Sequence, residues 1–151
     1  MKKKQGNKQR QKFNCLTNAQ KPVEAMTAND VAFMSDRIFR DLAKGNFDPT
    51  TDAPKFENNP IFLNQLIVSA QIKLFEANLI ANSMNFCFND AVKKGSVIDQ
   101  NSAAVKNRWE NKAQAYNVLV IELMNIQNTG SAVTPLAKIS QQLWKVKQYF
   151  D

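Results

Sequence analysis

Residues 59–95 read NPIFLNQLIVSAQIKLFEANLIANSMNFCFNDAVKKG, and this stretch decides the fold. Asn59 is a good helix cap, and Pro60 suits the first helical position, where its missing N–H costs nothing. No further proline or glycine occurs until Gly95, which follows two lysines, and this combination is typical of a helix end. The stretch therefore predicts one unbroken helix over about 60–94, roughly 50 Å long at 1.5 Å per residue.

The apolar residues of this helix fall into two stripes, each with steps of three and four residues, and together they exceed one ordinary amphipathic face. A helix buried on two sides within its own bundle is the more ordinary interpretation. A helix this long outruns the core of a 151-residue domain, however, so one stripe can instead serve a neighbouring subunit. The first stripe is Leu63, Leu66, Ala70, Leu74, Ala77, Ala81, Met84, Phe88 and Ala91. The candidate interface is the second stripe with one residue of the last predicted helix: Val68, Ile72, Phe75, Leu79, Phe86 and Trp144.

The remaining segments predict shorter helices packed against this one. Thr27 and Asp30 have the spacing of a capping box, and the break after the central helix is so short that the next helix must return antiparallel. Residues 46–58, with two prolines, read as an irregular surface loop. We expect an all-α, four-helix bundle-like domain over residues 27–151, built on a long antiparallel helical hairpin, after a flexible basic arm in residues 1–26. The expected helices span about 28–44, 60–94, 97–127 and 135–149.

Positive charge is concentrated at the start of the chain. Residues 1–12 carry six of the seven net positive charges and no acid, whereas residues 13–151 hold 14 basic and 13 acidic side chains. A lysine-rich segment suits sequence-independent contact with the phosphates of nucleic acid, although a solubilising terminus has the same composition. The candidate nucleic-acid-binding residues are Lys2, Lys3, Lys4, Lys8, Arg10 and Lys12.

Residues that carry chemistry are scarce. Histidine is absent, which excludes His-dependent nucleophiles. Cys15 and Cys87 lack the spacing of a metal or redox motif, and no phosphate-binding glycine loop occurs. Glu76 with Asp90 or Glu122 could in principle form a carboxylate pair that faces the core, but such isolated residues are usually solvated or paired. We therefore expect no enzyme activity, no metal site, no cofactor and no small-molecule substrate.

The central helix is not expected to enter a membrane, because Gln or Asn recurs every few residues and no run of about twenty apolar residues occurs. No apolar segment of a secretory signal follows the basic start, so the expected location is the cytoplasm, or a virion if the source is viral.

These features favour a non-enzymatic structural or assembly protein. The expected partners are further copies of the chain or a larger protein assembly, with nucleic acid or an acidic partner at the lysine-rich arm. A head–tail connector or ring protein of a virion would have this shape. The alternative is a soluble nucleic-acid-binding regulatory or packaging protein, and a third hypothesis is a metal-free helical enzyme or an enzyme inhibitor.

Overall fold

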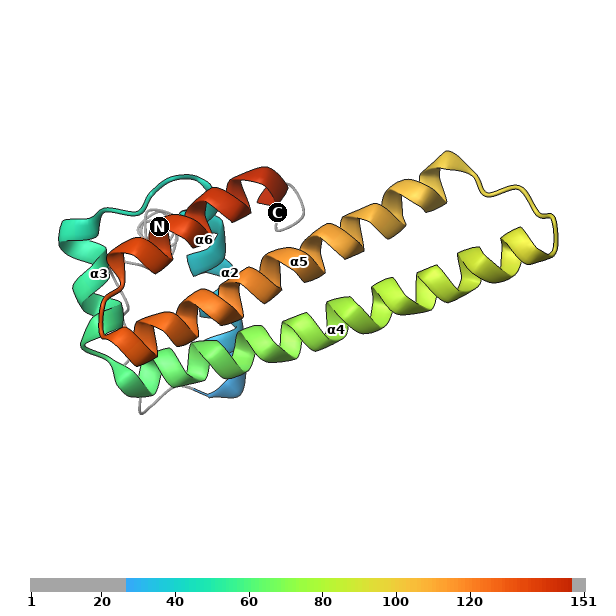
Figure 1. The fold of residues 1–151 in the computed structure, drawn as a ribbon. Helices are drawn as coiled ribbons and strands as arrows, with labels where there is room; N and C mark the ends of the chain where they lie inside the picture. The colour runs from blue at the N-terminus through green and yellow to red at the C-terminus, as the bar shows by residue number, and fades with distance from the viewer. Residues whose placement is uncertain (1–26, 148–151) are drawn as a thin grey trace, which may run out of the picture.

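The computed structural model of the protein describes residues 27–147, which form five α-helices joined by short connections (Figure 1). The all-α prediction is confirmed for these residues. The predicted arm (1–26) and the last four residues lie outside the described part of the chain. The helices are α2 (Ala28–Ala43), α3 (Pro49–Glu57), α4 (Pro60–Lys93), α5 (Gln100–Thr129) and α6 (Val133–Val146).

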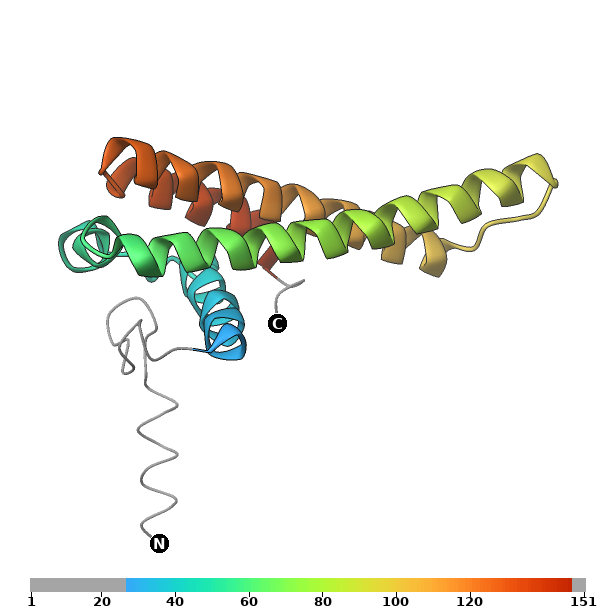
Figure 2. The ribbon, with the colours of Figure 1, turned by 90° about the horizontal axis from the view of Figure 1, so that it is seen from below.

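The two longest helices, α4 and α5, form an antiparallel hairpin that extends well beyond the other helices (Figures 1 and 2). The α4 helix is unbroken, as predicted, because no proline or glycine interrupts it after Pro60. At its end, Gly95 takes a φ of +71°, a left-handed conformation that other residues adopt only with strain. The amide of Gly95 donates to the carbonyl oxygen of Val92 at 3.1 Å, which closes the helix.

The other three helices pack around the base of this hairpin. Helix α6 lies against α5 and α2, helix α2 also contacts α4, and the short α3 lies at the end opposite the hairpin tip (Figure 1). Full burial of a large apolar side chain stabilises the fold by roughly 1.5–3 kcal/mol, so the stability of the chain is concentrated in this core. Its fully buried residues include Phe39, Leu66, Leu119, Leu136 and Leu143.

The hairpin tip is solvated and its base is buried, as the sequence predicts. The buried residues of α4 end at Ala81 and those of α5 begin at Ala113, and none of the residues 82–112 between them is buried. From Ala81 to Lys93 the hairpin extends about 18 Å at 1.5 Å per residue. The long helices therefore present much more surface than the bundle covers.

The prediction of an irregular loop over residues 46–58 is wrong, and with it the count of four helices, because α3 lies there. Asp48 caps α3 by accepting a hydrogen bond from the Thr50 amide at 3.0 Å, and the buried Asp52 carboxylate accepts one from the Asp48 amide at 2.7 Å. Phe56 of α3 is 1% exposed and packs into the core. The hydrogen bonds of Asp48 and Asp52 and the burial of Phe56 stabilise this helix more than Pro54 within it destabilises it.

Two predicted helix starts and one predicted helix cap are also corrected, while the predicted start of α4 at Pro60 is confirmed. Asn59 makes no side-chain cap, because its amide donates instead to the carbonyl of Lys55 in α3. Helix α5 starts at Gln100 rather than 97, since the carboxylate that caps it belongs to Asp99 and accepts from Ser102 N at 2.7 Å. Helix α6 starts at Val133, two residues before the predicted position, with no side-chain cap. The capping box at the start of α2 is present as predicted.

Candidate protein interface on the outer face of helix α4

The second apolar stripe of α4 is exposed along its whole length. The first stripe faces α5 and is buried at the base of the hairpin and half-buried towards the tip. The second stripe lies on the side of α4 away from α5, and among the described residues only α2 borders it, at Val68 and Ile72. The bundle therefore does not bury the second stripe, although α2 and α3 as well as α5 contact α4. The exposed fractions are 47% for Val68, 55% for Ile72, 68% for Phe75, 56% for Leu79 and 74% for Phe86.

Ile61 extends this stripe by one position and was not among the interface residues predicted from the sequence. It is 53% exposed and lies seven residues before Val68, which in turn lies seven before Phe75. Ile72, Leu79 and Phe86 form a second row with the same seven-residue spacing. Two such rows, offset by alternating steps of three and four, are the a and d positions of a coiled-coil seam. We call this surface the α4 seam: Ile61, Val68, Ile72, Phe75, Leu79 and Phe86.

Two polar residues complete the heptad positions of the α4 seam. Gln65 precedes Ile72 by seven residues, and Asn82 follows Phe75 by seven. The Oε1 atom of Gln65 is buried, yet it accepts no hydrogen bond from any residue between 27 and 147. A buried carbonyl oxygen without a donor costs about 1–3 kcal/mol, so the Gln65 amide lies in an unfavourable environment.

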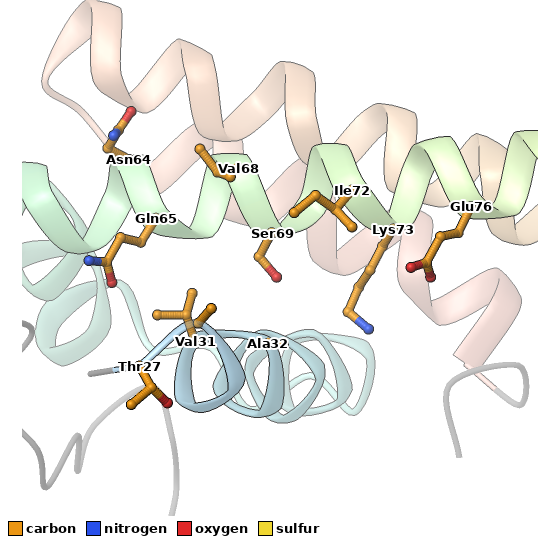
Figure 3. Close-up of a pocket in the computed structure, with 11 residues that line it drawn as sticks. Thr27, Val31, Ala32, Asn64, Gln65, Val68, Ser69, Ile72, Lys73 and Glu76 are labelled. Atoms are coloured by element: carbon orange, nitrogen blue, oxygen red, sulfur yellow. The ribbon is translucent and has the colours of Figure 1, made fainter.

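A groove of about 380 Å³ runs beside the seam, between the start of α2 and the first half of α4 (Figure 3). Val31 of α2 points towards α4, while Gln65, Ser69 and Lys73 of α4 extend towards α2. The groove is mostly apolar, and Val68 and Ile72 of the seam line it. It therefore provides a recess next to the seam that can accept a side chain.

The opposite flank of the seam is lined by amides. Asn64, Gln71, Asn78 and Asn85 repeat every seven residues and are all exposed. Asn78 and Asn85 also line a polar hollow of about 450 Å³ between α4 and α5. This flank carries hydrogen-bonding groups without net charge, so it neither repels nor strongly selects a charged partner.

Trp144 is separated from the other predicted interface residues. It lies on α6, which packs on α5 and α2 rather than along α4. The ring is 58% exposed, and the ammonium group of Lys147 lies 4.0 Å from its centroid in a cation–π contact. Trp144 thus belongs to a different surface from the α4 seam.

The predicted nucleic-acid-binding residues, all within residues 1–12, lie outside the described part of the chain, and so does Cys15. Two of the lysines near the hairpin tip are paired with acidic residues. Lys94 pairs with Asp90, and Lys106 pairs with Glu110, each at 3.0 Å. These ion pairs offset part of the positive charge at the tip.

The described residues hold no group of three or more metal-ligating side chains and no helix apolar enough to span a membrane. Cys87 is a free, exposed thiol on α4. Of the three carboxylates considered from the sequence, Glu122 is buried, while Glu76 and Asp90 are exposed. Asp90 pairs with Lys94 at the hairpin tip and Glu122 lies near Lys138 of α6, so these two carboxylates belong to separate ion pairs.

No protein-family model, curated protein or solved structure matches this chain. Its function must be inferred from the properties of its own surface, of which the α4 seam is the most unusual part.

Proposed function

We propose that this chain is a non-enzymatic structural protein, a helical subunit that joins a larger assembly through the α4 seam. The observation that carries the proposal is the row of six large apolar side chains, each 47–74% exposed, on one face of one helix. Single exposed apolar residues are common on monomers, but a continuous patch of this size usually marks an interaction surface. An apolar helix face with heptad spacing is the surface that another helix covers.

The shape of the chain supports this role. The bundle at the base holds α2, α3 and α6 against the hairpin, so the projecting part of α4 is anchored at one end. The seam spans both regions, because Ile61 lies at the base and Phe86 lies beyond the last buried residue of α4. A partner that covers the seam would therefore also cover part of the projecting hairpin.

The lysine-rich residues 1–12 supply a separate contact with nucleic acid or an acidic partner. Six positive charges without an acid favour binding to phosphates through counterion release, which weakens steeply as salt rises. A chain that lacks residues 2–12 should lose salt-sensitive binding to DNA and RNA while keeping its assembly state. Equal binding by the full-length and shortened chains would contradict this part of the proposal.

The assembly role is tested by weighing the particle that contains the chain in its source cells. We expect a particle larger than the 17.1 kDa chain when it is isolated gently and measured by sedimentation or native mass spectrometry. The double variant Ile72→Glu/Leu79→Glu places two charges in the seam and should release the chain as a monomer. Val97→Glu alters a 96% exposed residue at the hairpin tip and serves as the control that keeps the particle intact.

A 17.1 kDa monomer from wild-type cells would contradict the assembly role. So would a particle of unchanged mass in the double variant, because the seam would then make no essential contact. Circular dichroism of the purified variants checks that their helices remain folded.

A further inference from the structure

We infer that the α4 seam binds the α4 seam of a second copy of this chain, in antiparallel orientation and with one defined register. The inference rests on the proposed assembly function and adds the identity of the partner, the direction of its helix and the residues that meet. The two-fold axis of this dimer crosses α4 at the level between Lys73 and Leu74. The two copies therefore pair about the middle of the seam.

The seam is a palindrome about this point. Residues at equal distance on either side of it share the same polarity, and each large side chain is matched with a smaller or more compact one. Antiparallel coiled-coil packing places a positions opposite d positions, so these are the residues that would meet. The pairs are Ile72 with Phe75, Val68 with Leu79, Ile61 with Phe86, and Gln65 with Asn82.

The polar pair sets the register. Asn82 is exposed, and its side-chain amide in the second copy would lie opposite Gln65, whose buried Oε1 lacks a donor among residues 27–147. To meet this amide, the Gln65 side chain would turn from the groove beside α2 towards the seam. A shift of the two helices by one heptad would instead oppose one of these amides to an apolar residue, either Gln65 to Phe75 or Asn82 to Ile72, and leave its polar atoms unsatisfied. One buried polar layer is a known means by which coiled coils select a single register.

The flanks of the seam are compatible with the same register. On the amide flank, Gln71 would face Asn78 and Asn64 would face Asn85 of the second copy, and each pair can exchange hydrogen bonds. On the flank next to α2, the position that Glu76 would approach is Ser69, which is buried against α2 and carries no charge. No carboxylate opposes a carboxylate across the seam, so the repulsion that usually disfavours self-pairing is absent.

The area of the seam agrees with a small dimer interface. With roughly 150–250 Å² for each large side chain, the exposed fractions correspond to on the order of 600 Å² of surface per copy. Flanking amides raise this towards the ~800 Å² per partner of a standard interface. At the level of Val68, the Leu79 side chain of the second copy would meet the groove of about 380 Å³ between α2 and α4.

The antiparallel direction is favoured over the parallel one by side-chain volume. A parallel pair would place Phe75 on Phe75 and Phe86 on Phe86, with the small pair Val68 on Val68 between the ends of the seam. The antiparallel pair combines each aromatic ring with an isoleucine, so the layers have similar volume and pack at even density. Opposed helix dipoles add a small favourable term.

Cysteine cross-linking of the purified chain tests the direction and the register. The background variant is Cys15→Ser/Cys87→Ser, into which Val68→Cys is placed in one chain and Leu79→Cys in another chain of different tag length. Mixing the two under mild oxidation should give the mixed disulfide dimer as the main product. Each variant alone should give little, because identical residues would lie about 16 Å apart, beyond the reach of a disulfide. Ile121→Cys, 50% exposed on α5, is the control for random collision.

A disulfide of Leu79→Cys with itself would show a parallel pair and overturn the inference. Equal yields for the mixed pair and the Ile121→Cys control would overturn it as well. In either case the proposed function is judged separately, by the mass of the particle from source cells. A purified chain that stays monomeric, together with a large particle from cells, would show that the seam binds a different protein.

Discussion

The ammonium nitrogen of Lys73 lies 3.1 Å from a carboxylate oxygen of Asp36, and this ion pair connects the middle of α4 to α2. Both side chains are partly buried, with exposed fractions of 23% and 38%. The contact helps to position α2 beside the groove and leaves the α4 seam free on the adjacent face.

Replacing Lys73 by Met should lower the free energy of unfolding by about 0.5–1 kcal/mol, since a partly shielded pair is worth more than an exposed one. The matched control is Lys94→Met, which removes an ion pair with Asp90 whose side chains are 71% and 50% exposed. Urea denaturation should show a smaller change for the control. A larger loss at Lys94 than at Lys73 would mean that the Lys73 contact does not stabilise the fold.

The core prediction concerns Leu66, which is fully buried where α4 meets the rest of the bundle. Leu66→Ala should lower the free energy of unfolding by about 2–5 kcal/mol, because it removes buried apolar surface and leaves a cavity. Val97→Ala, at a 96% exposed site, should change it by less than about 0.5 kcal/mol. Equal effects of the two substitutions in thermal or urea denaturation would place the core elsewhere.

The buried phenol of Tyr116 should make the fold less stable at alkaline pH. Burial, followed by the nearby charges of Asp36 and Glu76, raises the pKa of its phenol well above the usual value. In the unfolded chain this phenol loses its proton near pH 10, whereas in the folded chain it keeps it. The unfolded state therefore binds fewer protons above about pH 10, and the stability contributed by the neutral phenol falls as the pH rises.

Tyr116→Phe should remove this part of the alkaline loss. Urea denaturation of both proteins from about pH 9 to pH 11 should show a steeper decline for the wild type. Parallel curves, or a phenol absorbance at 295 nm that titrates near pH 10 in the folded Tyr149→Phe variant, would show that Tyr116 is solvated.

Glu122 is a buried carboxylate between α5 and α6, and its negative charge is only partly balanced by neighbouring groups. Its Oε1 accepts a hydrogen bond from Asn125 at 2.8 Å, and the Lys138 ammonium lies 3.9 Å away. Its Oε2 is buried and accepts no hydrogen bond from the described residues. Glu122→Gln should therefore leave the stability unchanged or raise it by up to about 1 kcal/mol, because the buried charge disappears.

Lys138→Met should have the opposite effect and lower the stability by about 1 kcal/mol, since the buried carboxylate then lacks its nearest cation. Lys145→Met, at an exposed residue on the same helix, is the control. Thermal denaturation at neutral pH compares the three. A greater loss in Glu122→Gln than in Lys138→Met would show that the charge of Glu122 is well compensated.

The sequence predicted the central helix and its two stripes because a long regular period of three and four residues outweighs local exceptions. It also predicted the solvated tip, since charged residues cluster on both sides of Gly95. The helix α3 was missed because Asp48-Pro49 and Pro54 are typical of turns. The helix becomes evident only in the folded chain, where Phe56 is buried in the core and Asp48 caps the helix.

The candidate interface was predicted in part. Periodicity showed that α4 has more apolar surface than one face needs, and the structure places five of the six predicted residues in one exposed row. Trp144 was grouped with them only because it stood off the apolar stripe of its own helix, and no sequence pattern states which surface such a residue joins. Ile61 was overlooked because it directly follows the proline that starts α4.

The central claim is that α4 has two interfaces, one with its own bundle and one with a second copy of the chain. Sedimentation equilibrium of the purified protein over a series of concentrations tests it most directly. We predict a species of twice the 17.1 kDa chain mass for the wild type and for Ile121→Glu, and a monomer for Ile72→Glu/Leu79→Glu. A wild type that remains at 17.1 kDa at every concentration, or a double variant that remains dimeric, would contradict the claim.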